Sequence, residues 1–252
     1  MKRVVLITGG TSGFGLSAIK VFLREEKKNI QIISLSRSIE KIVLAKKELG
    51  SNSKLVDFLQ ADVSKPDELE QAAKQISKKY GHVDVLVNNA GTIIPGGVES
   101  LKTNDWDWVL TNNLSSYFYM TKIFLPLLKA SSDACVVNIS STSAKLGGSS
   151  IAYSVSKAGV DMITRVSAKE LSKYKIRVNA VSPGVVNTGF HVSNKAMDEE
   201  TYNKFISAKD KEYPLGLGDP SDVAEAIYYL SSPKAKWLTG TNILVDGGRS
   251  SV

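Results

Sequence analysis

Two kinds of segment alternate along the chain, and this alternation constrains the fold more than any other feature. Seven short runs are rich in β-branched and other apolar residues, at 4–8, 30–35, 55–59, 83–87, 136–139, 176–181 and 243–245. Because these runs are continuous rather than alternating with polar residues, they are typical of strands buried on both faces. Amphipathic stretches typical of helices lie between them, at about 14–28, 38–49, 66–80, 105–129, 152–173 and 220–231. The pattern predicts an α/β fold: a single doubly wound, Rossmann-type domain with a seven-stranded parallel sheet.

One segment interrupts this rhythm. After the run at 176–181, a stretch rich in glycine surrounds a polar helical segment at 198–211. Long insertions in compact domains are often functional lids, and this one follows the carboxyl end of a predicted strand, where open α/β sheets bind ligands. We therefore expect residues 1–252 to form one domain with a substrate lid at about 186–217. An ordinary surface excursion is the alternative.

Composition excludes several classes of protein. The one cysteine, Cys135, cannot form an internal disulfide, and with two histidines the chain is poorly supplied for a metal site, so no metal is expected. The net charge is +7, but it comes from 26 lysines and only 6 arginines spread evenly over both halves, so no nucleic-acid partner is expected. No uncharged apolar run approaches the ~20 residues that span a bilayer. These features favour a cytoplasmic protein without a membrane partner.

The first predicted strand runs into a glycine-rich turn that leads into a helical pattern. The turn has the sequence Thr8-Gly9-Gly10-Thr11-Ser12-Gly13-Phe14-Gly15. Glycines here permit a tight turn, close approach of the backbone to a pyrophosphate, and close packing of helix on strand, while the helix N-terminus offers amides to phosphates. At the first strand-to-helix junction this pattern predicts a dinucleotide site, with a merely structural turn as the alternative.

The end of the second predicted strand distinguishes between the two nicotinamide dinucleotides. A ribose 2′-hydroxyl calls for a carboxylate about 20 residues past the glycines, whereas a 2′-phosphate calls for an arginine. Here the strand ends at Ser36-Arg37, and the nearest acid, Glu40, lies in the next helix. The sequence therefore predicts NADP(H) in preference to NAD(H), with Ser12 as a further hydroxyl contact. A surface arginine without a ligand is the alternative.

Tyr153 and Lys157 lie four residues apart on a predicted helix and so share one face. Composition alone predicts roughly one Tyr-x-x-x-Lys in such a chain, so the spacing by itself is weak evidence. A tyrosine with an ordinary pKa near 10 shuttles protons poorly at neutral pH unless a nearby cation stabilises its phenolate. Lys157 is placed to do this, and two serines, Ser140 and Ser141, end the preceding strand.

The chain from Val4 to Gly248 resembles the short-chain dehydrogenase/reductase family, in its compact form of roughly 250 residues. The resemblance rests on several motifs in the right order: Thr8-Gly9-x-x-x-Gly13-x-Gly15, Asp62-Val63, Asn88-Asn89-Ala90-Gly91, Asn113, Ser141, Tyr153-x-x-x-Lys157, Pro183-Gly184-x-x-x-Thr188 and Val245-Asp246-Gly247-Gly248.

The resemblance implies catalytic roles for four residues. Tyr153 is expected to protonate the substrate oxygen, and Lys157 to bind the nicotinamide ribose and lower the pKa of the tyrosine. Ser141 is expected to hydrogen-bond the carbonyl, and Asn113 to hold a water in a proton relay. The residues expected to contact the cofactor are Gly9, Ser12, Gly13, Phe14, Gly15, Ser36, Arg37, Asp62, Val63, Asn89, Ala90, Gly91, Tyr153, Lys157, Pro183, Gly184, Val186 and Thr188. Asn88 is expected to be a structural link between strands.

Two of these assignments have a neighbour that competes for the role. In the family the serine usually precedes the tyrosine by thirteen residues, which matches Ser140, but Ser141 fits the strand register better. A one-residue deletion in the loop at 147–150 reconciles the two, and Ser141 is preferred. Asn113 is preferred to Asn112 because Leu114 follows it, as in the family.

These features predict an NADP(H)-dependent oxidoreductase that acts on CH–OH/C=O groups, a carbonyl reductase or secondary alcohol dehydrogenase. A catalytically silent NADP(H)-binding sensor is the main alternative, and lyase or isomerase chemistry is a third. The expected pocket walls carry no lysine or arginine, which favours a small uncharged carbonyl or alcohol substrate over carrier-bound acyl chains.

The resemblance also implies a homodimer or homotetramer built through the helices at 105–129 and 152–173. Trp106 and Trp108 are expected to serve packing or subunit contacts. The walls expected are Ile93, Ile94, Ser143, Leu146, Phe190, Met197 and Phe205.

Overall fold

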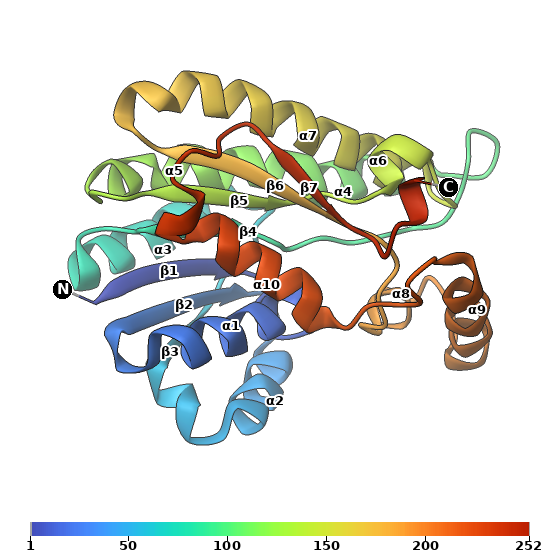
Figure 1. The fold of residues 1–252 in the computed structure, drawn as a ribbon, viewed down its shortest axis with the longest axis horizontal. Helices are drawn as coiled ribbons and strands as arrows, with labels where there is room; N and C mark the ends of the chain where they lie inside the picture. Colours follow the sequence, from blue (N-terminus) through green and yellow to red (C-terminus); the bar gives the residue numbers. More distant parts are fainter. Residues whose placement is uncertain (1, 252) are drawn as a thin grey trace.

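A computed structural model describes residues 2–251 and contains one seven-stranded sheet (Figure 1). Every neighbouring pair of strands is parallel, and their order in the sheet is β3-β2-β1-β4-β5-β6-β7. The order reverses between β1 and β4, which is the point where ligands bind in doubly wound sheets. The predicted fold class is confirmed. The strands are β1 Arg3–Thr8, β2 Ile30–Ser36, β3 Val56–Gln60, β4 Val85–Asn88, β5 Cys135–Ile139, β6 Arg177–Pro183 and β7 Asn242–Val245.

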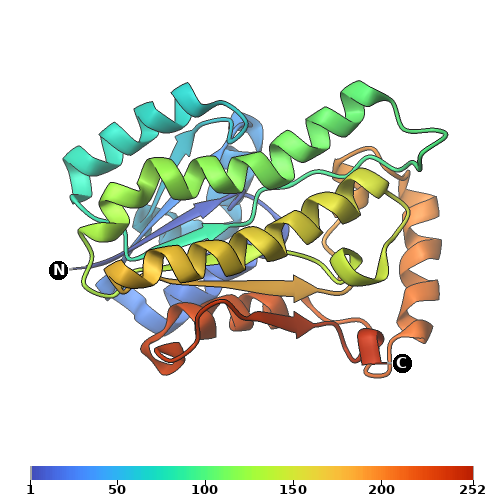
Figure 2. The same cartoon turned by 90° about the horizontal axis from the view of Figure 1, so that it is seen from above.

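Helices cover both faces of the sheet because successive strand residues point to opposite sides. In β1, Val5 and Ile7 face a core closed by α1 (Gly13–Glu26), α2 (Ile39–Leu49) and α10 (Pro220–Ser231). Val4 and Leu6 face a second core, closed by α3 (Pro66–Tyr80), α5 (Ser116–Lys129) and α7 (Ile151–Leu171). Figure 2 shows the three helices of this second layer running side by side. Short 3-10 turns complete the chain at Lys27–Asn29, Gly50–Leu55, Ser172–Tyr174, Pro233–Ala235 and Arg249–Ser251.

The helical stretch predicted at about 105–129 is present, but it is not a regular α-helix throughout. The structure has α4 (Thr103–Leu110), a π-helical segment (Thr111–Ser115) and then α5. The segment buries Asn112 and Asn113. Asn112 Nδ2 donates to the Trp108 carbonyl oxygen one turn earlier in the same helix, and Asn113 Nδ2 donates to the carbonyl oxygen of Thr92 in the turn after β4. Single π turns of this kind often lie at functional sites.

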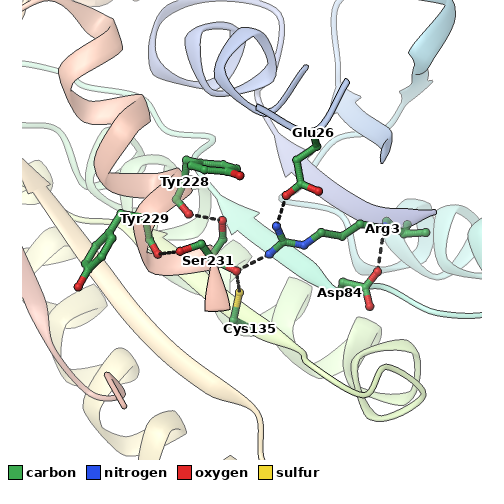
Figure 3. A network of polar contacts seen from close by, with 9 residues as sticks. Arg3, Glu26, Asp84, Cys135, Tyr228, Tyr229 and Ser231 are labelled. Carbon is green, nitrogen blue, oxygen red and sulfur yellow. Dashed lines mark hydrogen bonds and ion pairs between the residues drawn. The ribbon is translucent and has the colours of Figure 1, made fainter. Parts of the chain in front are cut away.

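The amino-terminal edge of the sheet is closed by a polar network (Figure 3). The Arg3 guanidinium pairs with Glu26 at the end of α1 and donates to the carbonyl of Ser231 at the end of α10. The same carbonyl accepts from Cys135 Sγ at 3.7 Å, and the Val4 amide donates to Asp84 Oδ2 at 2.7 Å. A cation at a helix C-terminus is favourable, so this network links the sheet to the layer of α1 and α10 and has a structural role.

Three helices lie at the opposite end of the strands. They are α6 (Ser143–Leu146), α8 (Phe190–Ser193) and α9 (Glu199–Glu212), the last two within the 186–217 segment. In Figure 1, α8 and α9 stand beyond the carboxyl ends of the strands. None of the helices between residues 2 and 251 combines the length and the apolar character needed to cross a bilayer.

Candidate active site

A cavity of about 740 Å³ lies at the carboxyl ends of the strands, on the side of the 186–217 segment. It is bounded by the turns that follow β1, β2, β3, β4, β5 and β6, and by α7. Among residues 2–251 no three His, Cys, Asp or Glu side chains gather in a way that could hold a metal ion. Of the predicted site residues, those lining the cavity are Gly9, Ser12, Gly13, Phe14, Ser36, Arg37, Asp62, Val63, Asn89, Ala90, Gly91, Ser141, Tyr153, Lys157, Pro183, Gly184, Val186 and Thr188. Gly15 and Asn113 do not line it.

The glycine turn after β1 has the backbone that its sequence requires. Gly9 and Gly13 have positive φ angles of 69° and 51°, which favour glycine. A Cβ on Gly15 would lie 2.4 Å from the Gly9 carbonyl oxygen, so Gly15 lies beneath the turn and supports it. The Asn89 side-chain amide donates to the carbonyl oxygens of Thr8 (2.9 Å) and Gly9 (3.2 Å) and links the turn to β4. A rigid turn that leads into the N-terminus of α1 fits a pyrophosphate.

The end of the cavity beside β2 and β3 is polar and basic. Ser36 Oγ lies 3.3 Å from Thr11 Oγ1, and the Arg37 guanidinium is exposed at the end of β2. Lys41, in the first turn of α2, also lines the cavity, and sequence reasoning did not single it out. Across from them, Asp62 Oδ1 accepts from the amide and hydroxyl of Ser64. Because this carboxylate is already bonded and the side chains at the end of β2 are basic, the residues present fit a phosphorylated ribose.

The structure separates the two candidate serines. Both serines line the cavity, but Ser140 Oγ lies 2.5 Å from Asp161 Oδ1 and 3.2 Å from the Lys157 carbonyl oxygen, so its hydroxyl is already engaged by these two acceptors. Ser141 lines the cavity beside Tyr153. Burial raises the pKa of the Tyr153 phenol, and the neighbouring Ser141 hydroxyl lowers it. Ser141 is thus the serine that shares the site with the tyrosine.

Lys157 is almost completely buried, with 3% of its surface exposed. Its Nζ donates to the Ile139 carbonyl oxygen at 2.7 Å and to Tyr117 Oη at 3.3 Å, and lies 5.6 Å from the centre of the Tyr153 ring. Burial lowers the pKa of Lys157 from 10.5 to about 7, against the opposing effect of Asp161. The amino group beside the Tyr153 phenol therefore has a pKa close to neutral pH.

Tyr117 is a residue whose part in the site sequence reasoning missed. It belongs to the core, being 1% exposed, but its hydroxyl also donates to the Ile139 carbonyl oxygen at 3.1 Å. The amino group of Lys157 thus lies close to two tyrosines, the buried Tyr117 and Tyr153. The only local signal is that Tyr117 lies four residues after Asn113, on the far side of the π segment.

Asn113 lies behind the cavity wall. Its Oδ1 accepts from the Thr92 amide at 2.7 Å, and its Nδ2 donates to the Thr92 carbonyl oxygen at 2.8 Å and to Ser156 Oγ at 3.2 Å. A Cβ on Gly91 would lie 3.3 Å from Asn113 Oδ1 and 3.8 Å from Lys157 Nζ. Asn113 therefore braces the strand end beside Lys157, and Asn112 reaches the cavity surface in its place.

Thr92 also connects this brace to the 186–217 segment. Its hydroxyl donates to Asn194 Oδ1 at 2.7 Å, and Asn194 Nδ2 donates to the Phe190 carbonyl oxygen at 2.8 Å. The segment also meets the glycine turn, because a Cβ on Gly13 would lie 3.5 Å from Thr188 Cβ. The segment after β6 thus contacts both the turn that follows β1 and the one that follows β4.

The expected substrate walls are corrected at several positions. Ile93, Ser143, Leu146, Phe190 and Phe205 line the cavity, whereas Ile94 and Met197 do not. The expectation of no basic residue was wrong, because Lys209 from α9 and Arg249 from the C-terminal turn also line it. Both approach Glu212, at 2.7 Å and 3.6 Å. Periodicity could not place them together, since Lys209 lies on α9 and Arg249 in the C-terminal 3-10 turn.

Aromatic rings line the substrate end. The Phe190 ring centre lies 6.2 Å from that of Tyr153, and the His191 ring centre lies 5.2 Å from that of Phe205. Burial lowers the pKa of His191 and so favours its neutral imidazole. This end of the cavity is therefore apolar at its walls and basic at Lys209 and Arg249.

Comparisons with known proteins agree with this geometry. The family model described as short chain dehydrogenase matches residues 3–199. A 3-oxoacyl-[acyl-carrier-protein] reductase of Thermotoga maritima is 34% identical over 248 residues, which cover 98% of this chain and 97% of that protein. The ligand-free aldohexose dehydrogenase of Thermoplasma acidophilum superposes with a TM-score of 0.87 at 31% identity, covering 100% of this chain and 95% of that one.

A second solved structure was determined with a dinucleotide. It is ElxO with NADP bound, which has a TM-score of 0.87 and 30% identity and covers 100% of both chains. Family model, full-length relatives and solved structures all match a chain whose glycine turn and Tyr153–Lys157 pair meet in one cavity. The chain belongs to the short-chain dehydrogenase/reductase family.

Proposed function

We propose that the protein is an NADP(H)-dependent reductase of carbonyl groups, reversibly an alcohol dehydrogenase. One observation carries the proposal: a single cavity has the glycine turn and Arg37 at one end and Ser141, Tyr153 and Lys157 at the other. Reduced nicotinamide supplies hydride when the cofactor is bound. The remaining task of the chain is to place and protonate the carbonyl oxygen.

Tyr153 donates its phenolic proton to the carbonyl oxygen as the carbonyl carbon accepts hydride, and the phenolate then regains a proton from solvent. Ser141 donates a hydrogen bond to the same oxygen. Burial opposes the charged phenolate, so the ammonium of Lys157 must offset that cost. General acid catalysis of this kind contributes about 10²- to 10⁴-fold. Asn113 keeps the Thr92 turn in place beside Lys157.

The proposed preference for NADP(H) is supported by Arg37 and Lys41 at the end of β2, and by the structural relative with NADP bound. Removal of Arg37 takes away charged hydrogen bonds worth about 1.5–3 kcal/mol, roughly 10- to 150-fold in affinity. We expect Arg37→Ala to weaken NADPH binding by this factor and to change NADH binding little. Equal changes for both cofactors would contradict the 2′-phosphate assignment.

For the substrate we propose a 3-oxoacyl thioester. The support is the similarity to 3-oxoacyl-[acyl-carrier-protein] reductases over nearly the whole of both chains, together with the cavity walls. Ile93, Leu146 and Phe190 suit an acyl chain, and the basic Lys209 and Arg249 suit the phosphate of a carrier arm. A small uncharged ketone is the second candidate, favoured by the apolar walls. The 186–217 segment is proposed to act as the lid over either substrate.

The test is oxidation of NADPH and NADH with a panel of 3-oxoacyl thioesters, neutral ketones, diketones, aldehydes and aldohexoses. Tyr153→Phe is measured in parallel, and we expect it to bind NADPH normally and to lose turnover. Preference for thioesters would support the first substrate class, and preference for ketones the second. Tight NADPH binding without turnover of any carbonyl or alcohol would instead support the catalytically silent sensor.

We further propose that the protein is a homo-oligomer. Phe118 on α5 and Val155, Met162 and Val166 on α7 are each 44–56% exposed, a concentration of large apolar side chains on two neighbouring helices. Light scattering of the full chain checks this, with Met162→Lys and Val166→Lys expected to yield monomers.

A further inference from the structure

The Arg37 guanidinium is held by an aromatic ring rather than by a polar partner. Arg37 follows directly after β2, and its Cζ lies 5.5 Å from the centre of the Trp108 ring. Within residues 2–251 its guanidinium has no ion pair and no hydrogen bond, and the Arg37 carbonyl oxygen accepts from Gln60 Nε2 at 3.2 Å. Its N–H groups are therefore free for an anion in the cavity that Arg37 lines.

Trp108 comes from a distant element and is itself tied to the cavity wall. It lies on α4, two residues before the end of that helix, and is 40% exposed. Its carbonyl oxygen accepts from Asn112 Nδ2 at 2.9 Å, and Asn112 lines the cavity. The π segment that begins at Thr111 thus anchors the turn that carries the indole.

We propose that Trp108 is a positioning residue for cofactor selection: its indole ring holds Arg37 at the carboxyl end of β2, with the guanidinium N–H groups left for a ribose 2′-phosphate. A guanidinium can stack on an aromatic face while its edge still makes hydrogen bonds. A long side chain that is already ordered loses less rotamer freedom when the ligand binds, so it binds more tightly. Trp108 does not line the cavity and acts through Arg37. The inference rests on the proposed use of NADP(H).

This assignment differs from a packing role in what it predicts about ligands. A tryptophan that only packs α4 would affect NADP⁺ and NAD⁺ equally, because the two differ only in the 2′-phosphate. A tryptophan that positions Arg37 would affect NADP⁺ alone, and only while Arg37 is present. Trp106 provides a matched control, since it lies on the same helix and the cation–π contact of Arg37 is with Trp108.

The experiment is calorimetric binding of NADP⁺ and NAD⁺, without substrate, to the full chain and its variants. The variants are Trp108→Leu, Trp108→Phe, Trp106→Leu, Arg37→Ala and the double variant Arg37→Ala with Trp108→Leu. From the usual strength of an exposed cation–π contact, Trp108→Leu should weaken NADP⁺ binding about two- to fivefold and leave NAD⁺ binding unchanged. Trp108→Phe should lose less, Trp106→Leu should match the wild type, and the double variant should match Arg37→Ala.

Two results would overturn the role of Trp108. One is an equal loss of affinity for NADP⁺ and NAD⁺ in Trp108→Leu, and the other is the same loss for NADP⁺ in the Arg37→Ala background as in the wild type. If Arg37→Ala itself leaves the ratio of the two affinities unchanged, the proposed preference for NADP(H) fails instead. Thermal unfolding of each variant shows that the binding data refer to folded protein.

Discussion

Replacement of Lys157 by methionine tests the electrostatics of the site in the cofactor-free protein. Lysine in the unfolded chain keeps its proton up to about pH 10.5, whereas burial lowers the pKa of Lys157 to about 7 in the folded protein. Between these pH values unfolding takes up one proton. The free energy of unfolding of the wild type therefore rises with pH, and falls again as pH drops toward 7, by about 1.4 kcal/mol per pH unit.

The magnitude follows from the two pKa values. Between the two pKa values, about pH 7 and pH 10.5, the free energy of unfolding changes by about 5 kcal/mol because of Lys157. Between pH 7.5 and 9.5 it rises by about 2 to 3 kcal/mol. Lys157→Met removes this dependence and also removes the bonds from Nζ to Ile139 and Tyr117. Losing those bonds shifts the stability by about 1–3 kcal/mol at every pH, so the slope and not the offset is the test.

Urea unfolding at several pH values, followed by tryptophan fluorescence at fixed protein concentration and without dinucleotide, measures the slope. We expect the stability of the wild type to gain about 2 to 3 kcal/mol on that of Lys157→Met between pH 7.5 and 9.5. Lys169→Met, at an exposed position on the same helix, should follow the wild type. If the difference in unfolding free energy between the wild type and Lys157→Met does not change with pH, burial does not lower the pKa of Lys157 to near 7.

Three further perturbations follow from the geometry. Gly15→Ala places a Cβ 2.4 Å from the Gly9 carbonyl oxygen. It should weaken dinucleotide binding at least about tenfold and destabilise the fold by about 1–3 kcal/mol, as measured by calorimetry and thermal unfolding. Gly97→Ala, whose Cβ would meet open space, should change neither. Tyr117→Phe removes an acceptor of the Lys157 ammonium, so the pKa of Lys157 should fall further and the limb of the kcat profile that needs protonated lysine should move to lower pH; an unchanged profile would limit Tyr117 to packing. Burial raises the pKa of Cys135 to about 11, so a thiol reagent at pH 8 should label it only after unfolding, and rapid labelling of the folded protein would contradict its burial.

Some residues had partners that no sequence pattern could supply. Ser140 and Ser141 are adjacent and chemically identical and both follow the end of β5 at Ile139, yet Ser140 bonds Asp161 whereas Ser141 lies beside Tyr153. Asn113 is braced by Thr92 from another turn, and this pairing depends on the π segment that interrupts the predicted helix. The spacing of apolar residues indicates which side of a helix is buried. It does not reveal the extra residue per turn that turns part of an α-helix into a π-helix.

The sequence by itself determined the strands, the glycine turn and the shared face of Tyr153 and Lys157, because each depends on local spacing and on which residues avoid water. Only the tertiary structure decided what these residues meet. The contacts of Arg37 with Trp108 and of Lys157 with Tyr117 join elements that are distant in the chain, and the approach of Lys209 and Arg249 to the cavity depends on how α9 and the C-terminal turn pack beside it. Such contacts are set by the order of strands in the sheet and the packing of helices upon it, which local composition does not encode.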